Sequence, residues 1–226
     1  SREVRKEDAK LLVYVSVKVK SWDDYIASIQ NLLSVGKQHF NSDEIGHMTC
    51  LGRCHENSAF HFQGKNYSGK AIEYLGELIK HDSDLNIDKY TVKASGKAIL
   101  TKDFSSVSKH YEPFLEALKK DSSKVLEEIK ISNLRGRGGA GFPMGMKLEF
   151  CRKEENKNKF IICNADEGDP GAYSDRYLLE KQPHAVLFGM LISGYVTHAS
   201  HGILYIRAEY PEAARIVQKA IDVLRL

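Results

Sequence analysis

A glycine-dense loop flanked by cations is the part of this sequence best suited to binding a phosphate. Residues 134–147 read LRGRGGAGFPMGMK and include five glycines. Backbone N–H groups approach a phosphate closely where side chains are missing, and Arg135, Arg137 and Lys147 would neutralise its charge. The alternative is a flexible surface loop. Glycine loses more conformational entropy on folding than other residues do, so five glycines are not expected in a loop without a function. The loop therefore predicts a phosphate-binding site.

The loop does not match the standard dinucleotide or nucleoside triphosphate motifs. Its glycines satisfy the pattern G-x-G-x-x-G at Gly136, Gly138 and Gly141. A dinucleotide fingerprint, however, follows a strand and opens a helix directly, and Pro143 and Gly145 are expected to interrupt a helix here. A Walker loop is excluded as well, because the lysine lacks the required glycine spacing and a following Ser or Thr. We therefore expect no ordinary Rossmann turn at this loop.

Acidic and amide side chains gather directly after a predicted strand. Residues 159–164, KFIICN, are apolar enough for a strand, and the segment NADEGDPGAYSDR covers residues 164–176. Open α/β sheets bind ligands at the carboxyl ends of their strands. A calcium loop would need alternating ligands and a late Glu, which are absent, and a merely solvated acidic turn is the other alternative. The side chains that could bind ligand hydroxyls are those of Asn164, Asp166, Glu167 and Asp169.

The first 82 residues predict a small α/β domain. Valines alternate with other residues over 11–20, which indicates a half-buried strand. Residues 22–36 carry apolar side chains at helical spacing, with Ser21 placed as the N-cap and Gly36 at the end. The remaining predicted elements of this domain are strands over residues 48–51 and 59–62 and a helix capped by Ser68.

A polar, weakly patterned linker over residues 83–109 separates this domain from a second one, residues 110–226. Strands alternate with helices in the second domain, which implies a parallel sheet with helices on its faces. The predicted helices cover residues 114–118, 125–129 and 183–198 and a segment starting near Pro211, and the predicted strands cover residues 159–164 and 202–207.

Composition excludes several classes of protein. The formal net charge is only +3 over 226 residues with interspersed signs, so we expect no nucleic-acid partner. The longest apolar stretch, residues 185–196, is too short to cross a bilayer and predicts a buried helix. The charged start does not resemble a secretory signal, and four scattered cysteines favour a reducing compartment. We expect a cytoplasmic protein with no direct membrane span.

The glycine loop and the acidic strand end together resemble the flavoprotein subunit of respiratory complex I. This family is shared with NAD-reducing hydrogenases and NAD-dependent formate dehydrogenases. Further matches are Asp175-Arg176, Pro183-His184 and the segment IRAEYPEA at residues 206–213, so that the resemblance covers residues 134–226. It implies an α/β fold in which a thioredoxin-like ferredoxin domain precedes part of a Rossmann-like FMN-binding domain with a parallel sheet.

The resemblance also implies a function. In that family NADH passes a hydride to FMN, and the flavin hands electrons singly to iron–sulfur clusters. The chain would then be the diaphorase module of a multi-subunit NAD-linked oxidoreductase. The alternative is a non-catalytic assembly subunit that keeps the nucleotide-binding fold as a scaffold. The implied cofactors are FMN and NAD, and the implied partners are NADH, iron–sulfur electron-transfer subunits and a second segment or chain that completes the flavin pocket.

Carried over residue by residue, the resemblance assigns two sets of binding residues. Those expected at the FMN phosphate and ring are Gly136, Arg137, Gly138, Gly139 and Lys147, and those expected to hydrogen-bond the flavin and its ribityl chain are Asn164 and Asp166.

Further residues are expected around the nucleotide. Phe142 and Phe150 would sandwich its base, and ordinary core packing is the alternative for each of them. Glu167, the expected catalytic residue, and Asp169 would lie on the NADH side near the face of hydride transfer. Asp169 stands where the family usually has Glu, so its carboxylate reaches less far.

Two cysteines in the N-terminal half raise the question of a metal. Cys50 and Cys54 resemble the second cysteine pair of the family's thioredoxin-like [2Fe–2S] domain. Four ligands are needed, and Ser16 and Ser21 stand at the spacing of the first pair, where serine is a poor substitute for thiolate. We therefore expect no cluster in this chain and a structural or docking role for the domain.

Two other uses of these cysteines remain open. A zinc site could draw on His55 and His61 together with the cysteine pair, although the spacing is not a recognised zinc pattern. A redox-regulated binding protein could instead use Cys50 and Cys54 as a thiol pair, which a reducing cytosol disfavours. We predict no metal ligands.

Overall fold

The computed structural model describes two compact units of this chain. Its described residues are 9–15, 21–48, 51, 53, 56, 58–81, 98–103, 106–137, 139–169, 172 and 174–225. The first unit joins residues 1–95 with segments 167–176 and 207–215, and the second unit joins residues 96–166, 177–206 and 216–226. The predicted end of the first domain, at residue 82, lies outside the described residues.

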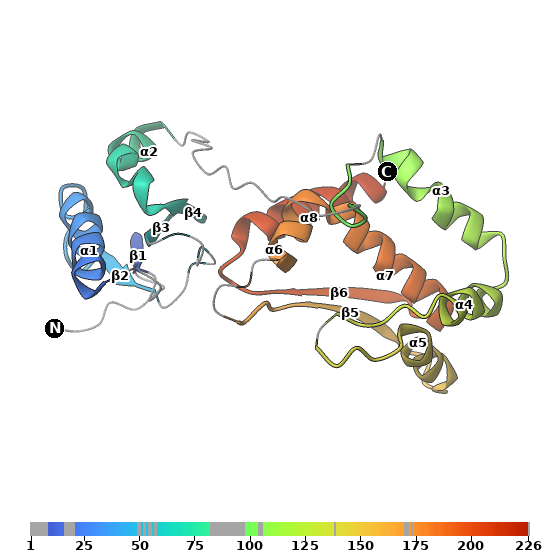
Figure 1. The fold of residues 1–226 in the computed structure, drawn as a ribbon. Coiled ribbons are helices and arrows are strands. Elements are labelled where there is room, and N and C mark those ends of the chain that lie inside the picture. The colour runs from blue at the N-terminus through green and yellow to red at the C-terminus, as the bar shows by residue number, and fades with distance from the viewer. Residues whose placement is uncertain are drawn as a thin grey trace. The chain divides into compact units, whose positions relative to one another are not determined.

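A four-stranded sheet in the order β2-β1-β3-β4 forms the centre of the first unit (Figure 1). β1 pairs in parallel with β2 and antiparallel with β3, and β3 pairs antiparallel with β4. The core packs Leu11, Leu32, Phe60 and Ile72 between the sheet and its helices. The elements are β1 (Leu11–Val15), α1 (Trp22–Gly36), β2 (Ile45–His47), β3 (Ser58–Phe62), β4 (Lys65–Ser68), the 3-10 helix η1 (Gly69–Tyr74) and α2 (Leu75–His81).

The helix predicted over residues 22–36 is confirmed as α1, together with its cap. The Ser21 hydroxyl accepts a hydrogen bond from the Asp24 backbone N–H at 3.1 Å. The cap predicted at Ser68 is confirmed as well, because its hydroxyl accepts from the Lys70 backbone N–H at 3.3 Å. The helix that it opens begins as the 3-10 turn η1 before it continues as α2.

Two strands of this unit were not expected. β2 lies at Ile45–His47, where Gly46 hides the alternating pattern, and the strand expected over residues 48–51 falls partly outside the described residues, at positions 49 and 50. β4 was not expected, because Lys65–Ser68 offers few apolar residues. The hairpin before it turns through Gln63 and Gly64 at φ values of 47° and 73°, and this positive-φ pair is what tight hairpins require.

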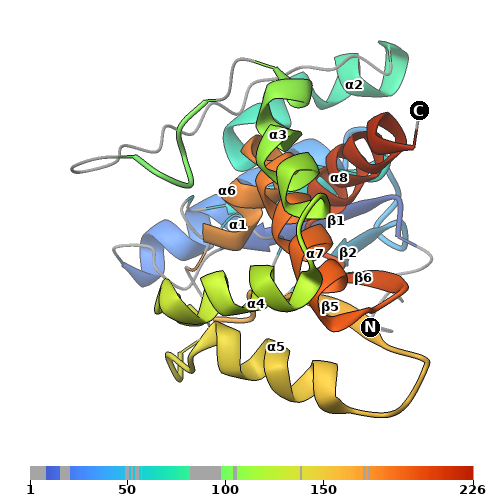
Figure 2. The same ribbon diagram turned by 90° about the vertical axis from the view of Figure 1, so that its right-hand side faces the viewer.

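In the second unit, helices pack around the parallel pair β5–β6. The register pairs Phe160 with His201 and Ala165 with Ile206. Figures 1 and 2 show α7 lying alongside the pair, and α3 packs on α7. The elements carried wholly by this unit are α3 (Val107–Leu118), α4 (Ser122–Ile131), α5 (Met144–Lys153), β5 (Phe160–Ala165), α7 (Pro183–Thr197) and β6 (His201–Ile206). Two more helices, α6 (Ser174–Lys181) and α8 (Pro211–Leu224), run from the first unit's segments into the second.

Most predictions for this half of the chain are confirmed. The strands predicted over residues 159–164 and 202–207 and the helix predicted over residues 183–198 shift by one residue at most. The helix predicted from Pro211 begins there. The short helices predicted around residues 114–118 and 125–129 are parts of the longer α3 and α4.

The expected interruption of a helix at Pro143 and Gly145 is wrong. Pro143 is the N-cap of α5, and Gly145 is buried in its first turn. A Cβ atom at Gly145 would lie 2.5 Å from Cγ and 2.8 Å from Cα of Lys130. Glycine is therefore present because α5 approaches α4 closely at this point, and not because the chain turns. The glycine loop follows the helix α4 and not a strand.

One face of the β5–β6 pair is exposed in the part of the chain that the structure describes. Its apolar side chains include Ile162, which is 63% exposed, and Tyr205, which is 57% exposed. Asn164 lies on the same face, opposite Tyr205 in the register. Parallel strands are normally covered on both faces, so this surface is suited to contact with further protein.

Two glycine substitutions test the packing of α5 against α4. Gly145→Ala should lower the free energy of unfolding by about 1–3 kcal/mol, because the new methyl group meets the Lys130 backbone. Gly189→Ala, in α7, should raise it by about 0.5–1 kcal/mol, because no atom lies within 4 Å of its added Cβ. Urea denaturation of the two variants measures both effects, and equal changes would contradict the packing described.

A buried tyrosine–histidine pair links α3 to α7. The Tyr111 hydroxyl donates to the His184 backbone oxygen at 3.1 Å and lies 3.2 Å from His184 Nδ1. Burial, with His110 nearby as the second cause, lowers the pKa of His184. Burial also raises the pKa of Tyr111 to about 12, so the pair is neutral at neutral pH.

This pair predicts a loss of stability in mild acid. The unfolded chain protonates His184 near its ordinary pKa of about 6.5, whereas the folded chain resists protonation to lower pH. The stabilisation is therefore complete above about pH 6.5 and falls as the pH drops below it. Denaturation at about pH 7.5 and pH 5.5 should show a larger loss for the wild type than for His184→Gln. Equal losses would contradict the assignment.

Candidate functional site

The glycine loop is closed at its base by backbone hydrogen bonds. Arg135 and Pro143 form an antiparallel bridge, and the Gly136 N–H donates to the Phe142 carbonyl at 2.9 Å. The Arg135 guanidinium donates to the Gly141 carbonyl at 3.0 Å, so this cation is used to hold the loop itself. The expected phosphate-binding loop is thus a defined turn between α4 and α5.

Within the turn, two glycines have backbone conformations that disfavour other residues. Gly139 has φ +116° and Gly141 has φ +61°, and a Cβ at either would meet nothing within 4 Å. Glycine is needed at these two positions for its backbone conformation, while the surface of the loop stays open to a ligand. Gly138 lies outside the described residues.

Two cations beside the loop are available to an anion. The side chains of Arg137 and Lys147 are exposed. Among the residues that the structure describes, neither side chain has a hydrogen-bond or ion-pair partner. Exposed lysines and arginines do not by themselves indicate a binding site. Two unpaired cations at an open glycine turn, however, suit a phosphate group.

Phe142, just before α5, and Phe150, within α5, form an exposed aromatic pair. They are 46% and 52% exposed, and their ring centroids lie 6.5 Å apart with 48° between the ring planes. Because about half of each ring is exposed, neither ring is packed in the core, which was the alternative considered for each. The tilt means that one ring must rotate before both could lie parallel to a base between them.

The polar end of β5 places Asn164 and Asp166 in the same unit as the glycine loop. Both side chains are exposed, and Asn164 Oδ1 accepts a hydrogen bond from the Asp166 backbone N–H at 3.1 Å. This local turn fixes the amide at the end of the strand. The Asn164 amide nitrogen and the Asp166 carboxylate have no partner among the described residues, so both remain available to a ligand.

Glu167 lies in the first unit, where its carboxylate is fully engaged. One oxygen accepts from the Ser174 hydroxyl at 3.0 Å and from the Asp175 backbone N–H at 2.9 Å. The other accepts from the Arg176 backbone N–H at 3.2 Å and from the Tyr210 hydroxyl at 3.0 Å. Glu167 therefore caps the N-terminus of α6, where a negative charge is favourable.

Two arginines lie against the ring of Tyr210, whose hydroxyl donates to this carboxylate. The guanidinium carbons of Arg176 and Arg207 lie 5.6 and 5.3 Å from the centroid of the Tyr210 ring. Arg207 also donates to the Glu167 backbone carbonyl. Burial and the neighbouring Glu167 charge raise the pKa of Tyr210, so its hydroxyl stays protonated and donates. The same two causes raise the pKa of Asp175.

Sequence reasoning did not select Tyr210, and Asp169 shows no comparable anchoring. Tyr210 is almost wholly buried, and its one signal in the sequence was its place inside the segment IRAEYPEA. Asp169 is exposed, and its backbone carbonyl accepts from the Ala172 N–H at 3.0 Å. Its carboxylate has no partner among the described residues, so it is free to contact a ligand.

The structure describes few of the residues considered for a metal. Ser16, Cys50, Cys54 and His55 lie outside the described residues. His61 Nδ1 lies 2.7 Å from the Asn66 amide oxygen. Within the described part of the chain, no group of three or more His, Cys, Asp or Glu side chains could hold a metal ion. No helix that the structure describes is long and apolar enough to cross a membrane.

The second unit combines parallel strands, an open glycine turn and two cations without side-chain partners among the described residues, and these features suit the binding of a phosphate. Residues 129–226 match the family described as the Nuo51 FMN-binding domain. The match covers less than half of the chain, and it confirms the predicted resemblance over these residues.

Relatives of known name share this segment. The chain is 40% identical over 111 residues to the mitochondrial 51 kDa subunit of NADH-ubiquinone oxidoreductase of Neurospora crassa, covering 47% of this chain and 22% of that protein. It is 45% identical over 102 residues to the NAD-reducing hydrogenase HoxS subunit alpha of Cupriavidus necator, covering 45% of this chain and 17% of that protein. The chain thus spans less than a quarter of these relatives.

A solved structure resembles nearly the whole chain. The crystal structure of an air-oxidised NAD⁺-reducing [NiFe]-hydrogenase matches it with a TM-score of 0.68 and 26% identity, over 95% of this chain and 40% of that one. The match extends through the N-terminal half, which the family match does not reach. It confirms the predicted α/β fold class.

The cap at Glu167 predicts a local loss of stability on substitution. Glu167→Gln replaces one accepting oxygen by an NH₂ group that faces backbone and hydroxyl donors, and should cost about 1–2 kcal/mol. Asp169→Asn, on the same loop but without a side-chain partner among the described residues, is the matched control and should change stability little. Thermal unfolding distinguishes them, and an unaffected Glu167→Gln would contradict the cap.

Proposed function

We propose that this chain is the NADH-oxidising flavin module of a multi-subunit oxidoreductase. It transfers hydride between NAD(H) and FMN, and electrons leave singly toward iron–sulfur clusters in partner subunits. The observation that supports this proposal most strongly is the open glycine turn with two unpaired cations. This turn lies inside the segment that matches an FMN-binding family. Relatives named as NADH-ubiquinone oxidoreductase and NAD-reducing hydrogenase subunits support the choice of nucleotide.

The residues present fit the phosphate end of FMN. A phosphate needs donors and positive charge, and Arg137 and Lys147 supply cations that nothing else among the described residues uses. The open surface at Gly139 and Gly141 leaves room for backbone N–H groups to approach it. The Asn164 amide and the Asp166 carboxylate are the groups proposed for the flavin ring and the ribityl hydroxyls.

Bound FMN would supply the redox chemistry, accepting two electrons with a hydride and releasing them one at a time. The residues of this chain would bind the nucleotide and orient it. Phe142 and Phe150 offer apolar faces to a base and exclude water from it. Asp169 offers a free carboxylate to the sugar of NADH, and Glu167 fixes the loop from which Asp169 projects.

The exposed face of β5–β6 supports the proposal that a second segment or chain completes the flavin site. Ile162 and Tyr205 would be covered by a second segment or chain, and this contact would also enclose Asn164 at the end of the face. We place the protein in the cytoplasm, on the support of its charge pattern and scattered cysteines. We further propose that the N-terminal domain carries no [2Fe–2S] cluster, because serines stand at two of the four ligand positions.

Flavin binding by charge variants tests the proposal. In the assembled flavoprotein, Arg137→Ala and Lys147→Ala should each weaken FMN binding about 10- to 100-fold, the loss of one charge-assisted hydrogen bond. Their affinity for riboflavin, which lacks the phosphate, should change little. Flavin fluorescence quenching measures both ligands.

Lys157→Ala is the matched control, because Lys157 is exposed and has no partner among the described residues. It should leave FMN binding unchanged. Equal loss of FMN and riboflavin in the Arg137 and Lys147 variants would show that the cations do not hold the phosphate, and unchanged FMN binding would overturn the site.

A further inference from the structure

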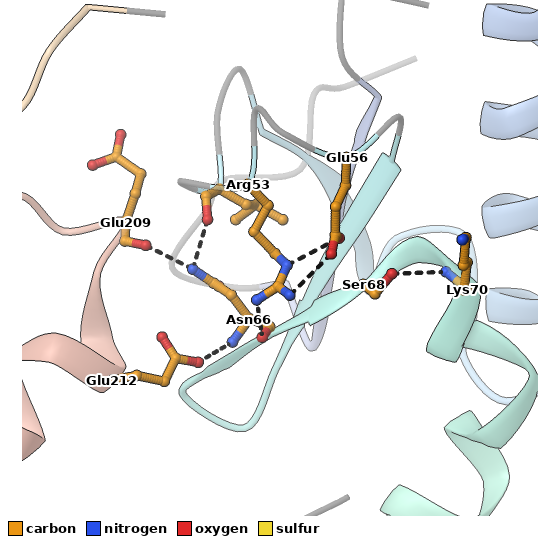
Figure 3. Close-up of polar contacts among 8 residues, drawn as sticks. Arg53, Glu56, Asn66, Ser68, Lys70, Glu209 and Glu212 are labelled. Atoms are coloured by element: carbon orange, nitrogen blue, oxygen red, sulfur yellow. Dashed lines mark hydrogen bonds and ion pairs between the residues drawn. The ribbon is translucent and has the colours of Figure 1, made fainter. Parts of the chain in front are cut away.

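The hairpin between β3 and β4 contacts the turn that leads into α8. The Asn66 backbone N–H donates to a Glu212 carboxylate oxygen at 2.6 Å, and the Asn66 amide nitrogen donates to the Glu209 carbonyl at 2.7 Å (Figure 3). All three residues belong to the first unit. One asparagine of the N-terminal half thus binds a segment more than 140 positions later.

Every hydrogen-bonding group of this asparagine is used. Asn66 is only 5% exposed. Its amide nitrogen also donates to the Leu51 carbonyl at 2.9 Å, and its amide oxygen lies 2.7 Å from His61 Nδ1. The buried Arg53 guanidinium donates to its backbone carbonyl at 3.2 Å (Figure 3). A buried and fully satisfied amide is held in one orientation, so it is a firm attachment point.

From this attachment point, polar contacts continue to Glu167. Asn66 holds the backbone of Glu209, and the Glu209 carboxylate accepts from Arg207 Nε at 3.1 Å. Arg207 in turn donates to the Glu167 backbone carbonyl. The carboxylate of Glu167 caps α6. The whole series lies within the first unit and ends at the residue proposed to support the NADH side of the site.

We propose that Asn66 is a positioning residue, through which the N-terminal domain holds Glu167 and the start of α6 in place for NADH. The part that concerns NADH rests on the proposed function. The role requires hydrogen bonds alone, so it is open to an N-terminal domain without an iron–sulfur cluster.

A second contact of the same hairpin offers a control. Arg215 donates to the Gly64 carbonyl at 2.9 Å, at the tip of the hairpin. This exposed contact also joins the hairpin to α8, but within the described part of the chain the Arg215 side chain hydrogen-bonds neither Glu209 nor Arg207. Arg215→Ala should therefore loosen the hairpin tip and leave the start of α6 unchanged.

Amide hydrogen exchange of the full chain tests the positioning directly. Asn66→Ala removes both amide donors. Glu209→Ala keeps the carbonyl that Asn66 contacts and removes only the link to Arg207. Both variants should speed exchange at residues 174–177 at least tenfold, with no change in α1. Unchanged exchange in α6 for Asn66→Ala, or an equal increase for Arg215→Ala, would overturn the proposal. If Asn66→Ala loosens the whole unit, Glu209→Ala decides by the same criterion.

Ligand affinities in the assembled flavoprotein separate positioning from general destabilisation. The Asn66 and Glu209 variants should weaken NADH binding about fivefold or more and leave FMN binding unchanged, because the proposed FMN ligands lie in the second unit. Equal weakening of both ligands would overturn the proposal. Faster exchange in α6 with no NADH binding by the wild type would instead refute the proposed function and leave the structural link intact.

Discussion

The hydrogen bonds of the Glu167 carboxylate hold the acidic loop after β5 and the start of α6 in place. The carboxylate accepts hydrogen bonds from the first turn of α6 and from the Tyr210 hydroxyl, and the Glu167 backbone is held by Arg207. Two separate stretches of the first unit, residues 167–176 and 207–215, therefore meet at one charged group. Removing such a group leaves several donors unsatisfied at once, and for this reason it fixes its surroundings more firmly than an exposed ion pair would.

This arrangement refines the role expected from the sequence. A residue expected to act at the face of hydride transfer has both oxygens occupied by donors of its own chain. It is suited to orienting a loop rather than to accepting a proton. Of the residues expected at the nucleotide, several have side-chain groups without a partner among the described residues: the cations of Arg137 and Lys147, the amide nitrogen of Asn164, and the carboxylates of Asp166 and Asp169. Different residues thus hold the site in shape and offer groups to a nucleotide.

The fold could be predicted where one strong pattern decided the local structure. The apolar run of α7, the strands β5 and β6 and the cap at Ser21 follow from spacing and propensity alone. The prediction failed where tertiary contact overrides propensity. Pro143 and Gly145 suggest a break, but the first caps α5 and the second makes room for Lys130. β4 is polar and is formed by its turn and its partner strand.

The candidate site was predictable in its residue types and not in their partners. The glycine turn and its cations are contiguous in the sequence, so their chemistry could be inferred directly. Arg135 could not be told from Arg137 without the contact that engages it. Tyr210 and Asn66 act across long sequence separations, and nothing in their own neighbourhoods signals the carboxylates and carbonyls they meet.

Anaerobic titration of the flavin-loaded assembly with NADH tests the central claim most directly. If this chain is the NADH-oxidising flavin module, the flavin absorption band will bleach as NADH is added, and the two electrons of each NADH will be shared between the flavin and the iron–sulfur clusters of the partner subunits. A bound flavin whose absorption band persists in excess NADH would contradict the account.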